Sequence, residues 1–212
     1  MRKIKVVLIA VAILIGTNVS AQNSPITFGV RAGVNLSDIL EIYGNEVNAS
    51  GGKVGFNAGI TMDYAFGTFG NRHSFYLLTG LEFTTKGARE EYSGETFTLN
   101  LMYLQVPIHF GYKLGVSDNV RMIFRIGPYV AYGVGGNASM TEGGVSVSVG
   151  AFSDELDLLN RFDVGLGFGT GVEFNRRVTL GLGFDLGLLN ISRNNDFGIN
   201  NANMHFTVGY RF

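Results

Sequence analysis

The segment Ile26-Thr-Phe-Gly-Val-Arg-Ala-Gly-Val-Asn-Leu36 alternates between two kinds of residue. Its even-numbered positions carry Phe, Val, Ala, Val and Leu, whereas the odd-numbered positions carry Thr, Gly, Arg, Gly and Asn. Successive side chains of a strand point to opposite faces of its sheet, so this period of two indicates a strand with one apolar and one polar face. The segment therefore predicts that the chain is built from two-faced β-strands.

The same alternation continues through the rest of the chain. It predicts eight strands, at about 26–36, 54–66, 74–86, 102–113, 120–134, 162–174, 178–188 and 202–212. Long connections, at about 37–53, 87–101, 135–161 and 189–201, alternate with short ones at 67–73, 114–119 and 175–177. Outer-membrane barrels have an even number of strands, short periplasmic turns and long extracellular loops. The chain is predicted to be all-β, an eight-stranded antiparallel up-and-down transmembrane β-barrel.

The two faces of the strands indicate which side meets lipid. One face carries mainly Phe, Leu, Val, Ile and Tyr, and the other carries Gly, Thr, Asn and charged residues. The interior of an eight-stranded barrel is only wide enough for side chains to fill it. We therefore expect the large residues to face lipid around a narrow polar lumen, with glycines such as Gly167 and Gly183 leaving room for the long inner side chains.

The two ends of the chain carry export and assembly signals. Arg2, Lys3 and Lys5 precede a short apolar run and a small-residue site ending at Ala21, which is typical of a cleaved secretory signal peptide. We expect residues 1–21 to be removed and residues 22–212 to form the barrel domain. At the other end, Phe206, Val208, Tyr210 and Phe212 are in phase and resemble the C-terminal signal that the barrel-assembly machinery reads. The expected location is therefore the cell outer membrane, with its lipid and that machinery as partners.

Composition excludes several other classes of protein. The chain has 212 residues, no Cys, 31 Gly and 16% charged residues. These values argue against a disordered chain, a disulfide scaffold and a Cys-ligated metal site. A net charge of −1 offers no basic field for nucleic acid. The glycines of 165–171 are spaced by two and lack the strand–helix context of a dinucleotide loop, so neither a cofactor nor a metal is expected.

Charged residues on the expected inner face form the candidate site. Arranged by height, Lys113 lies near the periplasmic end and Lys86 near the top, and the other members are Arg31, Asp63, Glu82, His109, Arg121, Arg125, Asp163, Glu173, Asp185, His205 and Arg211. Buried ions need partners, so this set predicts a salt-bridged plug that fixes the barrel. The alternative is a gated narrow pore, in which Arg125 would exchange between Glu82 and Asp185. Asp163 and His205 are both expected near the extracellular rim, but no nucleophile accompanies them, so the chain is not expected to be an enzyme.

Two irregularities interrupt the pattern. Pro107 and Pro128 each remove a hydrogen-bond donor from a closed ladder, so a bulge or a ladder end is expected near each. Phe97, Leu99 and Leu101 are also out of register with Leu104. This predicts a phase slip at about 101–103, where the strand would enter the membrane.

Four segments resemble PorT-like outer-membrane β-barrel proteins of the Bacteroidetes type: Gly29–Leu36, Gly80–Gly87, Tyr103–Pro107 and Phe162–Gly167. The resemblance covers essentially the whole mature chain and implies an outer-membrane barrel, in a family whose founding member is linked to protein secretion and assembly of surface machinery. From the residues, we expect a monomer with a plugged lumen and a structural or loop-mediated interaction role, with an extracellular or periplasmic protein as partner. The alternatives are a narrow solute channel, or an accessory component of protein secretion and surface assembly.

Overall fold

The computed structural model describes residues 25–43, 46–69, 72–153, 159–193 and 198–212, which contain ten strands. They are β1 (Ile26–Tyr43), β2 (Glu46–Ala49), β3 (Lys53–Phe69), β4 (His73–Tyr92), β5 (Glu95–Gly115), β6 (Val120–Glu142), β7 (Val145–Gly150), β8 (Phe162–Phe174), β9 (Val178–Gly187) and β10 (Gly198–Arg211). The predicted signal peptide lies outside the described residues.

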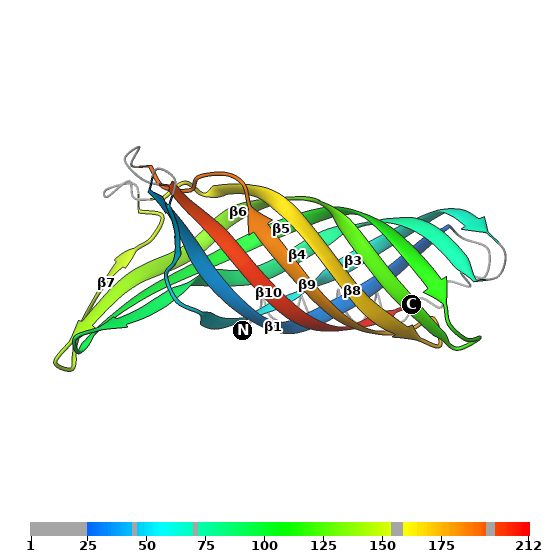
Figure 1. Cartoon of the computed structure of the whole chain (residues 1–212), viewed down its shortest axis with the longest axis horizontal. Helices are drawn as coiled ribbons and strands as arrows, with labels where there is room; N and C mark the ends of the chain where they lie inside the picture. The colour runs from blue at the N-terminus through cyan, green and yellow to red at the C-terminus, as the bar shows by residue number, and fades with distance from the viewer. Residues whose placement is uncertain (1–24, 44–45, 70–71, 154–158, 194–197) are drawn as a thin grey trace, which may run out of the picture.

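Eight of these strands pair antiparallel in a ring, in the order β1, β3, β4, β5, β6, β8, β9 and β10. The last strand, β10, also pairs with β1, from Gly29 with Arg211 to Ile42 with Gly198. Figure 1 shows the strands running obliquely around the long axis of the molecule. The remaining strands, β2 and β7, pair with β1 and β6 outside the ring. The all-β antiparallel barrel fold predicted from the sequence is confirmed.

No helix among the described residues is long and apolar enough to cross a membrane.

The two ends of the ring differ. The end that carries the short turns near Arg72, Ser117 and Asn175 also carries the start of β1 and the end of β10, and we call it the turn end. The opposite end, which we call the loop end, carries the longer connections. Aromatic rings from neighbouring strands contact one another near the turn end, where Phe66, Phe75 and Phe110 lie with centroids 5.6–6.5 Å apart. Outer-membrane barrels carry girdles of aromatic residues where they meet the membrane interfaces, and these aromatic side chains lie at one end of the ring.

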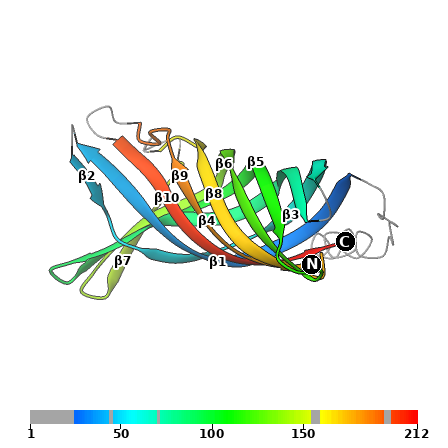
Figure 2. The same ribbon diagram turned by 45° about the vertical axis from the view of Figure 1, so that its right-hand side comes forward.

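The prediction of long loops at 87–101 and 135–161 is wrong for most of their length, because the strands continue through them. Pairing between β4 and β5 runs to Tyr92 with Glu95, and pairing between β6 and β7 runs to Glu142 with Val145. Each turn has two residues with positive φ, 50° and 91° at Ser93-Gly94 and 56° and 85° at Gly143-Gly144. Two-residue turns of this kind match the twist of antiparallel strands and close hairpins tightly. The result is a four-stranded sheet that projects beyond the ring, seen beside the β7 label in Figures 1 and 2.

Exposure separates the two faces as predicted. Large outward side chains are strongly exposed, 52% for Phe28, 57% for Val34 and 60% for Ile126. Inward side chains such as Tyr103 and Glu173 have no exposed surface. Because lipid takes the place of water around a membrane barrel, this inverted distribution is the one that the outer-membrane fold requires.

The expected ladder breaks near the prolines are present. Between β5 and β6, no pairs form between Pro107–Tyr129 and Phe110–Ile126. The ladder is interrupted there because Pro128 lacks an N–H. Between β4 and β5, no pairs form between Thr79–Ile108 and Glu82–Gln105, around Pro107.

The predicted phase slip at 101–103 is wrong. A β-bulge does lie here, with Val134 of β6 as the extra residue, but β5 alternates without interruption. Leu99, Leu101 and Tyr103 are buried in phase with Gln105. What changes along β5 is the chemistry of the inner face, which becomes apolar towards the loop end.

Candidate functional site in the barrel interior

The thirteen predicted inner residues lie on the inward-facing side of the ring. Arg121, Arg125 and Arg211 are partly buried, and the buried members, none more than 9% exposed, are Arg31, Asp63, Glu82, Lys86, His109, Lys113, Asp163, Glu173, Asp185 and His205. Ion pairs and hydrogen bonds divide the set into three layers stacked along the barrel. We call them the turn-end layer, the middle layer and the upper layer.

In the turn-end layer, three cations share two carboxylates. The carboxylate of Glu173 accepts a hydrogen bond from Arg121 Nε at 2.7 Å, pairs with Arg211 and lies 3.4 Å from Lys113 Nζ. Lys113 Nζ also lies 3.2 Å from an oxygen of Asp63, which pairs with Arg211 as well. Each carboxylate therefore bridges at least two cations, and so the buried charges largely compensate one another.

In the middle layer, each carboxylate has its own set of partners. Glu82 forms an ion pair with Arg31. Asp185 Oδ2 accepts a hydrogen bond from Gln105 Nε2 at 3.0 Å and lies 3.9 Å from His205 Nδ1. Arg125 pairs with neither carboxylate, although an exchange of Arg125 with Glu82 or Asp185 is what the alternative of a gated pore would require.

Glycines make room for the middle layer, as the sequence predicted. A Cβ on Gly167 would lie 2.6 Å from Asp185 Oδ1 and 2.8 Å from His109 Nε2. A Cβ on Gly183 would lie 2.3 Å from His205 Nε2. Approaches under 3.0 Å require a shift of one group, so these positions accommodate the inner side chains only because they lack a side chain of their own.

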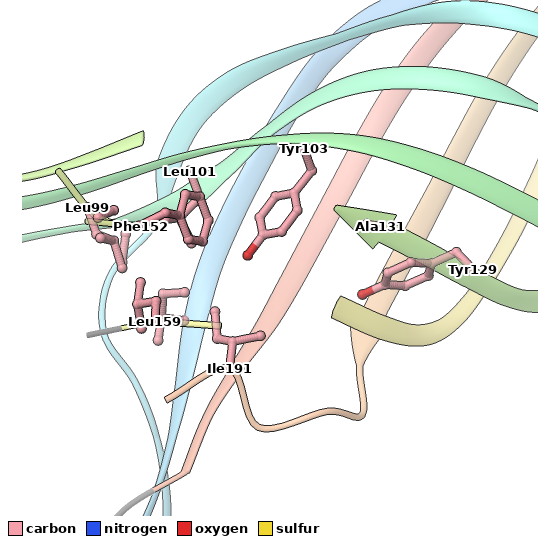
Figure 3. Packing of buried hydrophobic residues seen from close by; sticks show 11 residues of the cluster. Leu99, Leu101, Tyr103, Tyr129, Ala131, Phe152, Leu159 and Ile191 are labelled. Atoms are coloured by element: carbon pink, nitrogen blue, oxygen red, sulfur yellow. The ribbon is translucent and has the colours of Figure 1, made fainter. Parts of the chain in front are cut away.

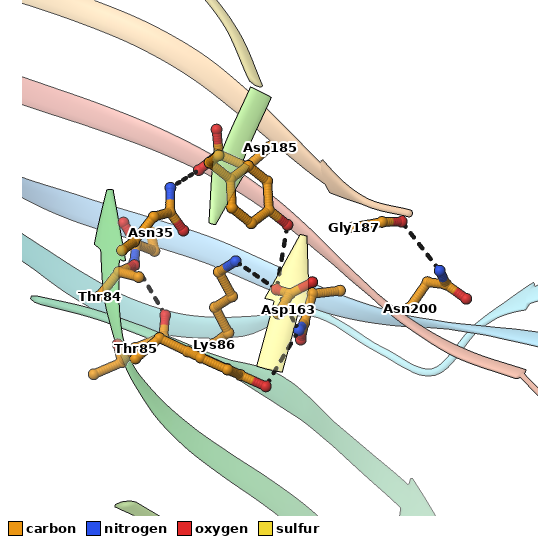
Figure 4. A network of polar contacts seen from close by, with 12 residues as sticks. Asn35, Thr84, Thr85, Lys86, Asp163, Asp185, Gly187 and Asn200 are labelled. Atoms are coloured by element: carbon orange, nitrogen blue, oxygen red, sulfur yellow. Dashed lines mark hydrogen bonds and ion pairs between the residues drawn. The ribbon is translucent and has the colours of Figure 1, made fainter. Parts of the chain in front are cut away.

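The upper layer is centred on one ion pair without any exposed surface (Figure 4). Lys86 Nζ donates to Asp163 Oδ2 at 3.1 Å, and both side chains are 0% exposed. The same oxygen accepts from Tyr129 OH at 3.2 Å and from Asn201 Nδ2 at 2.9 Å. Lys86 Nζ also lies 4.3 Å from the centroid of the Tyr129 ring, within the range of a cation–π contact.

His205 lies in the middle layer beside Asp185, so its predicted place beside Asp163 near the rim is wrong. Among the described residues, no group of three or more His, Asp and Glu could hold a metal ion. Asp163 and His205 therefore lie in different layers, Asp163 beside Lys86 and His205 beside Asp185.

An apolar cap closes the interior above the upper layer, so the expectation of a wholly polar lumen is wrong (Figure 3). Leu99, Leu101 and Tyr103 of β5 pack with Phe152, and the buried cluster also contains Ile39, Ala88, Tyr129, Ala131, Ala151, Leu159 and Ile191. The Tyr103 and Phe152 rings meet edge to face, with centroids 5.9 Å apart. Four of these residues, Ala151, Phe152, Leu159 and Ile191, come from the connections at the loop end.

Sequence reasoning missed three inner tyrosines and this cap. Tyr76, Tyr103 and Tyr129 are among the largest fully buried side chains. Their position in the alternation was the available signal, since Tyr103 is in phase with Gln105 and Tyr129 is in phase with Arg125. The predicted lumen set contained only charged residues and histidines, so it did not include these tyrosines.

Alternate residues at the end of β10 point outward from the ring. Phe206, Val208 and Tyr210 are 39–50% exposed, and Tyr210 and Phe212 contact edge to face. The ring closes here, because the β10 residues also pair with β1.

Comparison with known proteins agrees with this architecture. Residues 20–193 match the family model of the outer membrane protein β-barrel domain. No curated protein matches the chain. Similar solved structures include Ail, the attachment invasion locus protein of Yersinia pestis, at 19% identity over 89% of this chain and 99% of that one, with a TM-score of 0.41. They also include Neisserial surface protein A, at 18% identity over 87% and 97% with a TM-score of 0.41, and OprG of Pseudomonas aeruginosa, at 9% identity over 89% and 96% with a TM-score of 0.43.

The family match spans most of the chain and agrees with the ring of antiparallel strands, the exposed apolar exterior and the charged interior. The chain therefore belongs to the outer membrane protein β-barrel domain family and is an outer membrane protein.

Proposed function

We propose that this protein is a monomeric, non-enzymatic barrel with a plugged lumen, which anchors an extracellular sheet that binds a protein partner. The observation that carries the proposal is the apolar face of the sheet that projects beyond the ring. We call this sheet the sheet extension, and it comprises residues 88–92, 95–99, 138–142 and 145–150. Long connections of outer-membrane barrels face the cell exterior, which places the extension outside the cell.

Register sorts the side chains of the sheet extension onto two faces. On one face, Val147 stands opposite Met140, which stands opposite Phe97. These three side chains are 45–65% exposed, and on the same face Val145 and Tyr92 are exposed as well. The other face is polar, with Ser146 opposite Thr141 and Thr141 opposite Thr96. Exposed apolar surface above the membrane is a common mark of a protein-binding site.

Charge on the apolar face indicates the chemistry of the partner. Glu142 stands directly opposite Glu95, and Glu90 stands opposite Phe97. Like charges directly opposite one another destabilise a sheet, and the one exposed ion pair described here, Arg89 with Glu91, lies on the polar face. A partner that combines apolar with basic residues would cover the apolar face and relieve this repulsion. A second copy of the chain or an anionic lipid surface would instead add negative charge.

The edge of the sheet extension offers a second contact. Among the described residues, β7 pairs only with β6, and all six of its residues are exposed. Its sequence Val-Ser-Val-Ser-Val-Gly has neither the charge nor the proline that commonly protects edge strands. An extended partner segment could add to this edge through main-chain hydrogen bonds while its side chains cover the apolar face.

The test compares two charge insertions of the same size. Val147→Lys with Met140→Lys disrupts the apolar face, whereas Ser146→Lys with Thr141→Lys adds the same charge to the polar face. A synthetic peptide that alternates Val and Lys, added to the barrel in nanodiscs, should bind the first variant at least about tenfold more weakly, because interface anchors contribute more than about 1 kcal/mol each. It should bind the control like the unaltered protein. Equal loss in both variants, or no binding to the unaltered protein, would contradict the proposal.

A narrow channel, the alternative function, finds no support in the interior geometry. Lys86, Asp163, Leu101 and Tyr103 fill the lumen without exposed surface, with Leu101 opposite Lys86 in the ladder and the Tyr103 ring 5.3 Å from Lys86 Nζ. We expect no steady single-channel conductance from refolded protein in planar bilayers, with folding verified by the different gel mobility of heated and unheated samples. Stable conductance steps that change on Leu101→Ser would argue for a pore.

The absence of enzyme activity is likewise part of the proposal. It is supported by the separation of Asp163 from His205, each of which is engaged by other groups. The alternative of an accessory role in secretion rests on the resemblance to PorT-like proteins. The sheet extension is the surface through which such a role would act. The lipid-facing Phe206, Val208, Tyr210 and the terminal Phe212 are proposed as the signal for the assembly machinery.

A further inference from the structure

The charges of the interior do not balance. The three layers contain five carboxylates, Asp63, Glu82, Asp163, Glu173 and Asp185, against six cations, Arg31, Lys86, Lys113, Arg121, Arg125 and Arg211. Apart from the two histidines, the interior therefore contains one more cation than carboxylates, although the whole chain has a net charge of −1. A surplus charge held away from bulk water costs several kcal/mol unless a counter-ion meets it.

Of the six cations, Arg125 is the one to which the described ion pairs assign no carboxylate, whereas the three cations of the turn-end layer share two. Within the described part of the chain, the Arg125 guanidinium has no ion pair, and its Nη2 is shielded from solvent and has no hydrogen-bond partner. Glu82 is held by Arg31, and Asp185 by Gln105. Arg31, itself only 9% exposed, also has a shielded nitrogen without a hydrogen-bond partner, Nη1.

A cavity of about 50 Å³ lies beside these two guanidinium groups. Arg31 and Arg125 line it, together with the hydroxyl-bearing residues Thr61, Thr179 and Thr207. Asp63 and Arg211 also line it, but they pair with each other. One water needs a cavity of roughly 10–15 Å³. This cavity therefore has room for a small ion with a few waters and is too small for a nucleotide or a sugar.

Gly181 lies beside two hydrogen-bond donors of the cavity wall. A Cβ at this position would lie 2.9 Å from Thr207 Oγ1 and 3.8 Å from Arg125 Nη2. A hydroxyl and a guanidinium nitrogen therefore border the same volume, which exists because residue 181 has no side chain. Hydroxyl and guanidinium N–H donors are the groups that bind anions in proteins.

We propose that this cavity is an anion site that holds one small monovalent anion, chloride in the cell, as the counter-ion of Arg125. The anion accepts hydrogen bonds from Arg125 Nη2 and from the threonine hydroxyls, and it brings the charge of the interior to zero. The excess of arginine around the cavity would repel a cation. The competing occupant is water alone, and the experiment below separates the two.

The experiment uses the full barrel refolded in detergent micelles. Its thermal unfolding midpoint is measured in sodium chloride and in sodium gluconate at equal ionic strength, since gluconate is too large for the cavity. The midpoint should rise with chloride for the unaltered protein. The apparent chloride affinity should fall by at least about tenfold in Arg125→Gln, because a hydrogen bond to a charged group contributes about 1.5–3 kcal/mol.

Two further variants make the result specific. Gly181→Ala keeps the charge but narrows the cavity, so it should also weaken the chloride effect. Arg89→Gln removes an exposed arginine on the sheet extension and should leave that effect unchanged. Crystals soaked in bromide should show one anomalous peak beside Arg125. A midpoint that does not distinguish chloride from gluconate, a chloride effect that persists in Arg125→Gln, or a cavity without bromide would overturn the proposal.

Discussion

Replacing Asp163 with Asn is expected to lower the free energy of unfolding by about 3–5 kcal/mol, the usual cost of removing one partner from a buried ion pair. The substitution would leave the Lys86 ammonium uncompensated, with 0% exposure and with Tyr103 and Tyr129 around it. Urea unfolding of the barrel in lipid vesicles, followed by tyrosine fluorescence, measures the change.

A double variant tests the cause of this effect. Lys86→Met with Asp163→Leu removes both charges and should recover most of the lost stability, because apolar residues of similar volume often replace a buried pair at little cost. Glu91→Gln breaks the exposed pair with Arg89 and should change stability by less than about 1 kcal/mol. A double variant no more stable than Asp163→Asn would show that packing, and not the unpaired charge, sets the cost.

The second large effect is expected for Glu173→Gln at the turn end. Lys113, Arg121 and Arg211 would then share only the carboxylate of Asp63, and we expect a loss of about 3 kcal/mol. The value lies at the low end of the range because Arg121 keeps 23% of its side chain exposed and can be hydrated. The same urea titration measures it.

Removing one of the crowded cations should restore part of this stability. Arg121→Gln combined with Glu173→Gln is expected to be more stable than Glu173→Gln alone, with a coupling energy of about 0.5–3 kcal/mol in the double-mutant cycle. Additive effects of the two substitutions would refute the shared-carboxylate arrangement.

The sequence predicted the fold because period two acts within a single strand. Alternation in 26–36 or 162–174 assigns each residue to a face without any knowledge of its neighbours, and the large apolar set marks the lipid side. The alternation of 143–150 is typical of a hairpin above the membrane, but the continuation of β4, β5 and β6 into one projecting sheet was not predicted, because these segments are too polar on one face to resemble membrane strands.

Pairing between charges depends on register between strands, which one strand cannot encode. Arg31 stands opposite Gly59, and Gly59 stands opposite Glu82, so the two charged residues occupy one row with a glycine between them. A Cβ on Gly59 would lie 2.7 Å from the Glu82 side chain. Arg31 reaches Glu82 across this gap, and a shift of one pair in either ladder would have joined different residues.

The apolar cap makes the inner charges differ in their access to water at the two ends of the barrel. Lys86 and Asp163 have no exposed surface, and the Lys86 ammonium lies 5.3 Å from the centroid of the Tyr103 ring of the cap, whereas Arg121 and Arg211 at the opposite end keep some contact with water. In the proposed orientation, the residual water contact of Arg121 and Arg211 is on the periplasmic side of the membrane. Acid or salt added outside the cell should therefore act on the sheet extension and leave the inner layers shielded by the cap.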